Sequence, residues 1–265
     1  MYLPTLAEAR KLARYGNLIP VYREIMADLE TPVSAFLKIA RGDYSFLFES
    51  VEGGENLARY SFIGTEPALI LKTGSENPVN PLVGIERELS CFKLVANKNL
   101  PRFHGGMVGY LGYEVAGYFE RIESSRLDQL GLPESVFMMA DALLIFDHLT
   151  HKIKVVAHIY VDGDIEQAYR AATEKIDMLI DRLEKPVSCQ YLSLSPSQSS
   201  ISSETSNFTR EEFIRSVDKA KEYICAGDII QVVLSQRLAR PTDIDPFTLY
   251  RTLRSINPSP YMYYL

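Results

Sequence analysis

The chain has 265 residues, and its 46% content of hydrophobic residues is sufficient for a buried core in more than one domain. Its net charge is −6, with acidic and basic residues interspersed, and it lacks the clustered lysines and arginines that a nucleic-acid partner would require. Three cysteines far apart in the sequence favour reduced thiols over a disulfide framework, and no apolar run is long enough for a membrane span, so we expect a cytoplasmic protein.

The first 185 residues alternate between strand-like and helix-like segments, and we expect them to form one domain. Thr5 and Glu8 have the spacing of a capping box, and Thr31-Pro32 opens a second helix. The later segments, in chain order, are a β-meander formed by 44–51, 59–64 and 68–74 with a turn at 52–56, a helix at 82–94, a Gly- and Tyr-rich segment at 105–118, a hairpin formed by 142–148 and 152–161, and a helix at 164–184. A half-exposed strand is also expected at 18–26.

The composition changes after Pro186. Residues 186–207 are Ser-rich, and we interpret them as a linker. The second domain, 208–265, is expected to contain a helix that begins with a capping box at Thr209 and Glu212 and ends at Gly227, a strand at 228–238 and a helix that opens at Asp245-Pro246. This segment is too short to close a core, so we expect a truncated domain in which the final YMYYL is an interior strand. The less favoured alternative places YMYYL as an edge strand on the first domain.

No catalytic constellation is visible in the residues themselves. His104, His148, His151 and His158 lack partners at metal-ligand spacing, and structural roles are favoured for all four. The segment GGMVGYLGYE contains neither a dinucleotide fingerprint nor a P-loop, so its glycines indicate tight backbone packing beside tyrosines that fill a core or an interface.

Two short segments have the features of a ligand site. Glu49 and Ser50 end an apolar strand, where a carboxylate and a hydroxyl could meet a ligand ammonium and a ligand carboxylate; ordinary turn chemistry is the alternative. In NPSPYM the prolines lack N–H groups, which frees backbone carbonyls and the side chains of Tyr261 and Met262 to line a pocket. An irregular start of a strand explains the same pattern equally well.

Several segments resemble the large subunit of anthranilate synthase, component I. They are IPVYREI, FLFESVEGGENLARYSFIG, GGMVGYLGYE, GDIIQVVLSQR and NPSPYMYYL, in the same order and spacing, and they cover about the N-terminal half of that subunit. The resemblance implies an α+β fold with layered antiparallel sheets and outer helices, whose second domain is incomplete in this chain.

The resemblance also implies an activity. The family uses Mg²⁺ and ammonia from a glutamine amidotransferase subunit, component II, to convert chorismate to anthranilate and pyruvate in tryptophan biosynthesis. Its catalytic residues and Mg²⁺ ligands match no position in this chain, so we assign it no catalytic and no metal residues. We expect the chain alone to be inactive.

The feedback site of the family does carry over. It binds L-tryptophan between an LLES-type motif and an NPSPYM motif, which here correspond to Glu49 and Ser50, and to Pro260, Tyr261 and Met262. This chain has LFES, so Phe48 stands where leucine is common, and its larger ring alters the pocket wall beside Ser50. Arg59 is a further candidate, as a partner for the inhibitor carboxylate.

Three alternatives remain open at this point. Aminodeoxychorismate synthase component I shares the fold and the substrate, and it differs in a loop that has no counterpart in this chain. A non-catalytic tryptophan-binding module is the second alternative. A scaffold that docks a partner through residues 105–118 is the third.

Overall fold

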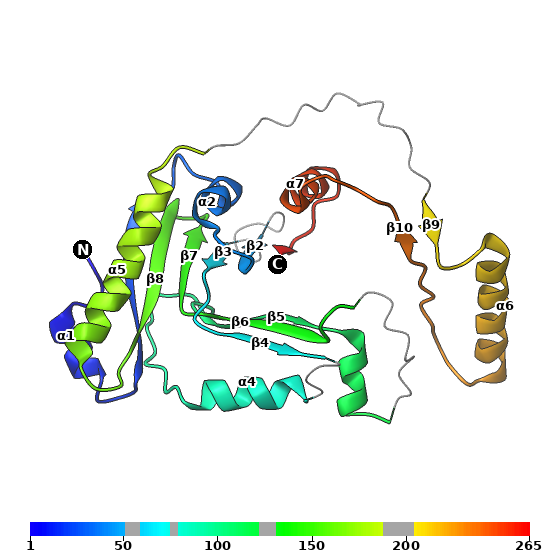
Figure 1. Cartoon of the computed structure of the whole chain (residues 1–265), viewed down its shortest axis with the longest axis horizontal. Coiled ribbons are helices and arrows are strands. Elements are labelled where there is room, and N and C mark those ends of the chain that lie inside the picture. The colour runs from blue at the N-terminus through cyan, green and yellow to red at the C-terminus, as the bar shows by residue number, and fades with distance from the viewer. Residues whose placement is uncertain (51–58, 75–78, 122–130, 188–203) are drawn as a thin grey trace. The chain divides into compact units, whose positions relative to one another are not determined.

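The computed structural model describes residues 1–50, 59–74, 79–121, 131–187 and 204–265. The chain forms two compact units, one of residues 1–189 together with 250–265, and one of residues 190–249 (Figure 1). Most of the predicted linker, 186–207, and the predicted turn at 52–56 lie outside the described residues. The domain boundaries inferred from composition therefore stay a prediction.

The first unit is built on a six-stranded antiparallel sheet. Its strands lie in the order β1-β8-β7-β3-β2-β11. They are β1 (Leu18–Met26), β8 (Lys152–Tyr160), β7 (Ala142–Asp147), β3 (Tyr60–Thr65), β2 (Ser45–Glu49) and β11 (Met262–Tyr264). The predicted hairpin is confirmed as β7 and β8, which pair from Ala142↔Ala157 to Asp147↔Lys152.

A second antiparallel sheet of three strands has the order β4-β6-β5. Its strands are β4 (Ile70–Thr73), β6 (Ser135–Ala140) and β5 (Gly106–Leu111), and a 3-10 helix, η1 (Tyr113–Tyr118), follows β5. The predicted meander is therefore only half right. β2 pairs with β3, but β4 leaves β3 and pairs with β6 in the other sheet. Local sequence predicted the strands correctly and not the change of sheet, because pairing partners are selected by burial across the whole unit.

Helices cover one face of the six-stranded sheet. They are α1 (Leu6–Leu12), α2 (Pro32–Ile39) and α5 (Ile165–Leu183), and α5 packs along β8 (Figure 1). The apolar stripe of α5 is buried at Ala172, Ile176 and Leu179, as its periodicity predicts. Both predicted capping boxes, at Thr5 and Thr209, are present. A further helix, α4 (Pro81–Ser90), packs against β4.

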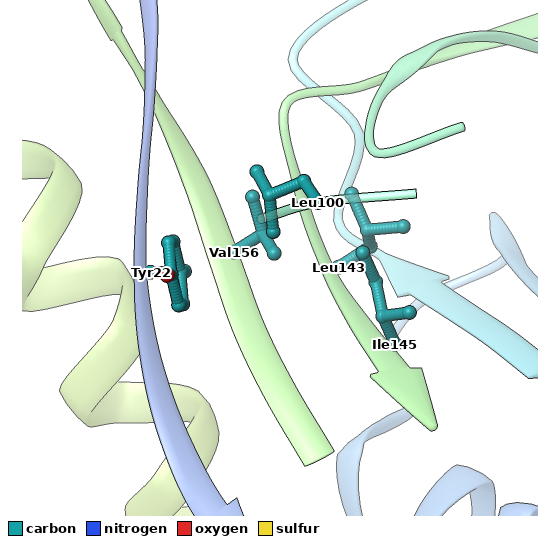
Figure 2. Close-up of a cluster of buried hydrophobic side chains, with 5 residues drawn as sticks. All are labelled: Tyr22, Leu100, Leu143, Ile145 and Val156. Carbon is teal, nitrogen blue, oxygen red and sulfur yellow. The ribbon is translucent and has the colours of Figure 1, made fainter. Parts of the chain in front are cut away.

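The opposite face of the large sheet is also buried. There, Tyr22, Leu143, Ile145 and Val156 form a cluster with Leu100, and Figure 2 shows these five side chains together. Phe46 contacts Val108, Met138 and Ala140 of the smaller sheet in a second cluster. Burial on both faces explains why β7 and β8 are apolar almost throughout, in contrast to the alternation of a strand with one wet face.

The C-terminal strand joins the large sheet of the first unit. β11 is the edge strand of the first unit's sheet, with Met262, Tyr263 and Tyr264 opposite Glu49, Phe48 and Leu47. Residues 250–265 belong to the first unit, so this pairing corresponds to the less favoured alternative, in which YMYYL is an edge strand on the first domain.

The second unit is small. It contains α6 (Arg210–Ala226), which ends at Gly227 with a φ of 85°, and two short paired strands, β9 (Thr205–Ser206) and β10 (Leu238–Ala239). The predicted strand 228–238 is wrong except at its last residue. Ile230 and Val233 are 97% and 82% exposed, and in the described residues 204–249 the run 229–236 belongs to no strand. An apolar run is a strand only where another strand pairs with it.

Helix α7 (Pro246–Ile256) contains the boundary between the units, with its residues up to 249 in the second unit and those from 250 in the first. Among the helices that the structure describes, none has the length and hydropathy to cross a membrane.

Two histidines form a hydrogen-bonded pair inside the first unit. His158 Nδ1 lies 3.1 Å from the carbonyl oxygen of Asp141, so this nitrogen carries the proton. His158 Nε2 then accepts from His104 Nδ1, also at 3.1 Å, and the rings stack with centroids 5.3 Å apart. Burial, and then the neighbouring His104, lowers the pKa of His158 to about 4. The structural role expected for these two histidines agrees with this arrangement.

We predict that Gly109→Ala destabilises the chain. A Cβ at Gly109 would lie 1.9 Å from the carbonyl oxygen of Val136 in the paired strand β6, so the backbone itself would have to move. The free energy of unfolding should fall by about 2 kcal/mol or more in urea denaturation. Gly84→Ala is the matched control. Gly84 lies in helix α4, where a Cβ would have its nearest neighbour, Leu71 Cδ1, 4.0 Å away, so the change should raise the free energy of unfolding by about 0.5–1 kcal/mol. Equal effects at both sites would contradict the packing argument.

We also predict that stability falls in mild acid because of His158. Its pKa is depressed in the folded state, so its contribution is complete above the unfolded pKa of about 6.5 and is lost as the pH falls toward about 4. The loss is up to about 3 kcal/mol. The measured quantity is the difference in unfolding free energy between pH 7 and pH 4.5. Compared with the wild type, this difference should be smaller in His158→Asn, which retains a donor for the Asp141 carbonyl. It should equal the wild-type value in the control His151→Asn, at an exposed turn. An unchanged difference in His158→Asn would refute the assignment.

Candidate functional site

One pocket of about 460 Å³ lies in the first unit beside the pairing of β2 with β11. Its volume lies in the range of small-molecule sites. β2 and the residue after it contribute one wall, β11 and the residues beside it contribute a second, and β3 and β5 complete the pocket. The lining residues are Phe48, Glu49, Ser50, Tyr60, Phe62, Gly109, Tyr110, Tyr261, Met262, Tyr263 and Leu265.

The pairing of β2 with β11 brings the two predicted segments together. Met262 lies directly opposite Glu49 in the ladder, although the two are more than 200 residues apart in sequence. Of the five predicted residues, Glu49, Ser50, Tyr261 and Met262 line the pocket, and Pro260 does not. Pro260 is exposed and directly precedes Tyr261.

The pocket is predominantly aromatic. Tyr60 and Phe62 come from β3, Tyr110 comes from β5, and Tyr261 and Tyr263 come from the C-terminal segment. Gly109 lies among them, and its missing side chain leaves room for the backbone of β6. A planar apolar ligand with a polar group matches this lining, because aromatic faces stack on it while Ser50 and the main chain offer hydrogen bonds.

Sequence reasoning did not assign Tyr60, Phe62, Gly109 and Tyr110 to a site. For residues 105–118 the sequence predicts tight backbone packing beside tyrosines that fill a core or an interface. Gly109 packs against Val136 as predicted, whereas Tyr110 lines the pocket. One signal was present: Phe48, Tyr60 and Phe62 are large aromatics at alternate positions of strands that were expected to pair. Their common face could have been proposed as a ligand wall.

Strand alternation places Glu49 and Met262 on the face away from these aromatics. Phe48 packs with Phe46 and faces the smaller sheet, so Leu47 and Glu49 face the helices. The residues opposite them in β11, Tyr264 and Met262, face the helices too, since the Tyr264 ring contacts Phe36 of α2 and Tyr250 of α7. Glu49 and Met262 therefore line the pocket with their main chain. The expected contact between the Glu49 carboxylate and a ligand ammonium is not part of this arrangement.

The Glu49 carboxylate instead binds side chains of α7. The Tyr250 hydroxyl donates to Glu49 Oε2 at 2.7 Å, and Arg254 Nε lies 3.0 Å from the same oxygen. Glu49 is only 3% exposed and Tyr250 is 6% exposed. Burial, and then the hydrogen bond to Glu49, raises the pKa of the Tyr250 phenol, so this group remains a donor at all physiological pH values.

Two neighbours extend this polar cluster on the helix face. The backbone N–H of Ser50 donates to Ser61 Oγ at 3.4 Å, and Ser61 Oγ lies 2.8 Å from His148 Nε2. Burial lowers the pKa of His148, although the charge of Glu49 opposes the shift. His148 is therefore neutral at neutral pH and can bond Ser61 without a second charge in the cluster.

Arg59, the candidate partner for an inhibitor carboxylate, makes a different contact. Its Nε and Nη2 lie 3.2 Å and 2.9 Å from the two carboxylate oxygens of Asp147. Burial raises the pKa of Asp147, but the hydrogen bonds and charge of Arg59 outweigh it and hold that pKa below its usual range. Arg59 is also absent from the pocket lining, and its guanidinium stacks over the Tyr60 ring at 4.9 Å.

Metal-binding groups were not expected in this chain. Within residues 1–50, 59–74, 79–121, 131–187 and 204–265, no group of three or more His, Cys, Asp or Glu side chains is arranged to hold a metal ion.

Comparisons with known proteins agree with the fold. A family model described as chorismate binding enzyme matches residues 43–265. Anthranilate synthase component 1 of Acetivibrio thermocellus is 43% identical over all of this chain and 57% of the relative, and the protein of the same name from Aquifex aeolicus is 40% identical over 98% of this chain and 56% of the relative. The chain thus spans about half the length of the curated relatives that it matches.

A solved structure gives the same result at the level of the fold. The crystal structure of anthranilate synthase component I from Streptococcus pneumoniae matches 89% of this chain and 53% of its own chain, with a TM-score of 0.65 and 25% sequence identity. The expected α+β fold with antiparallel sheets is confirmed by this match and by the sheet topology. With most of its residues matched by the family model, the chain belongs to the chorismate binding enzyme family and is a homologue of anthranilate synthase component I.

Proposed function

We propose that this chain is the N-terminal, regulatory part of an anthranilate synthase component I. The complete protein would convert chorismate and ammonia to anthranilate and pyruvate for tryptophan biosynthesis. Support comes from the family match over residues 43–265 and from relatives that carry this name at 40–43% identity. Catalysis would require the rest of the protein.

The regulatory ligand that we propose is L-tryptophan, bound in the pocket between β2 and β11. Ser50 and Tyr261 would contact it directly, Glu49 and Met262 through their main chain, and Pro260 would position Tyr261. The single observation that carries this proposal is that one aromatic pocket joins residues 48–50 to residues 261–263. An indole ring can stack among Tyr60, Phe62 and Tyr110.

Inhibition would operate by linkage. A ligand seated between the edge strand and its neighbour favours the arrangement in which β11 is paired. Its differential affinity for the two arrangements sets how far it shifts the equilibrium between them. The complete enzyme would work in the cytoplasm, would take ammonia from a glutamine amidotransferase subunit, and would use Mg²⁺. The metal would supply charge neutralisation at the substrate carboxylate when it is bound.

Two alternatives to this proposal give different products. An aminodeoxychorismate synthase would form aminodeoxychorismate from the same substrate, so product identification with the full-length protein separates the two enzymes. A stand-alone tryptophan-binding module would bind the amino acid and would have no chorismate-converting activity in its complete form.

We predict that the 265-residue chain binds L-tryptophan in calorimetric titration and that Ser50→Ala raises the Kd by about tenfold or more, because a hydrogen bond to a charged ligand group is lost. Ser45→Ala is the matched control. It lies on the same strand, but its hydroxyl bonds Arg41 and Thr65 and it does not line the pocket. In a full-length version, Ser50→Ala should weaken inhibition by tryptophan and leave uninhibited turnover intact. An unchanged Kd would remove Ser50 from the site.

We also predict that the chain alone, supplied with chorismate, ammonia and Mg²⁺, forms no anthranilate. None of its described residues is assigned a catalytic or metal-binding role. Anthranilate fluorescence detects the product sensitively, and the matched positive control is a full-length protein under the same conditions. Turnover by the purified chain would refute the assignment of catalysis to the rest of the protein.

A further inference from the structure

The strongest unassigned feature of the first unit is a buried carboxylate that the pocket does not use. Glu49 lines the pocket with its main chain, while its carboxylate lies on the other face of β2, against Tyr250 and Arg254. A buried carboxylate without partners would be costly, so its two contacts on α7 are what make this position tolerable. The same residue therefore belongs to the pocket wall and to the attachment of a helix.

Both contacts come from one turn of α7. Tyr250 and Arg254 are four residues apart and therefore lie on the same face of the helix. They reach the same oxygen, Glu49 Oε2, at 2.7 Å and 3.0 Å. The Tyr250 ring also packs on Tyr264 of β11, with centroids 5.7 Å apart. Together these contacts dock α7 on the β2–β11 pair.

α7 is also the segment through which the chain passes from the second unit into the first, since the boundary lies between residues 249 and 250. Residues 246–249 belong to the same helix as residues 250–256, so a change in how firmly residues 250–256 dock also acts on residues 246–249. Residue 49 pairs with Met262 of β11, and the preceding Phe48 pairs with β3 and with β11. A shift of the main chain at residue 49 therefore also moves the carboxylate that contacts α7.

From these contacts we propose that Glu49 is a positioning residue, which couples occupancy of the pocket to the docking of α7 through Tyr250 and Arg254. This inference rests on the proposed function, because the occupant is taken to be tryptophan. It differs from direct recognition, in which the Glu49 carboxylate would bind the ligand ammonium. The two roles make opposite predictions for a ligand that has no ammonium group.

The first arm of the test uses no ligand. Hydrogen–deuterium exchange is measured at the α7 amides from 250 to 256 in the 265-residue chain. Glu49→Gln and Tyr250→Phe should each speed this exchange by about tenfold, because each removes part of a charge-assisted contact. The matched control is Tyr169→Phe on α5, away from the pocket. It removes the hydrogen bond that the Tyr169 hydroxyl donates to the Pro4 carbonyl oxygen. It should leave α7 exchange unchanged.

The second arm compares L-tryptophan with indole-3-propionate, which has the same ring and carboxylate and lacks the ammonium. If Glu49 acts through α7, Glu49→Gln should raise the Kd of both ligands by the same factor, between about threefold and tenfold, since coupling is reciprocal and independent of the ammonium. Tyr250→Phe should do the same. If Glu49 binds the ammonium, Glu49→Gln should weaken tryptophan alone.

The outcomes separate the two proposals. Loss of affinity for tryptophan alone, or α7 exchange equal to that of Tyr169→Phe, overturns the positioning role while the tryptophan site stands. Failure of the wild-type chain to bind either ligand overturns the tryptophan site, whereas the ligand-free arm still decides whether Glu49 docks α7. Tyr250→Phe retains the ring that packs on Tyr264, so a folded variant is available even if Glu49→Gln does not fold.

Discussion

The pairing of β2 with β11 is the interaction on which the rest of the site depends. Three residue pairs join the edge strand to the sheet, and both walls of the pocket come from the two sides of this ladder. The same pairing brings Tyr264 against Phe36 and Tyr250, and so provides the surface on which α7 docks. A short contact between distant parts of the chain thereby creates the pocket and anchors the helix.

The two-residue period of a β-strand then divides the chemistry between two faces. Phe48 lies on the aromatic side, and Glu49 turns its carboxylate toward α7. A buried carboxylate next to an apolar pocket would otherwise impose a charge on it. Its separation by the sheet leaves the pocket apolar, with Ser50 and main-chain groups available to a polar ligand.

Sequence reasoning succeeded where the signal is local. The capping boxes at Thr5 and Thr209, the stripe of α5 and the hairpin β7–β8 follow from spacing within a few turns or strands. It failed where burial across the whole unit decides. β4 leaves its neighbour β3 for the other sheet, and residues 229–236 have strand composition but belong to no strand. Proximity between β5 and β2 is likewise not encoded locally, which is why Tyr110 was missed.

The order of the sheet also has a consequence for biosynthesis. Five of its strands lie before residue 161, and the sixth, β11, begins at Met262. Because a chain is made from its N-terminus, these five strands can pair on the ribosome while the outer edge of β2 has no neighbour. The nascent protein must therefore keep an incomplete sheet edge from pairing with other chains for about a hundred further residues of translation, an interval of roughly 5–20 seconds at ordinary elongation rates.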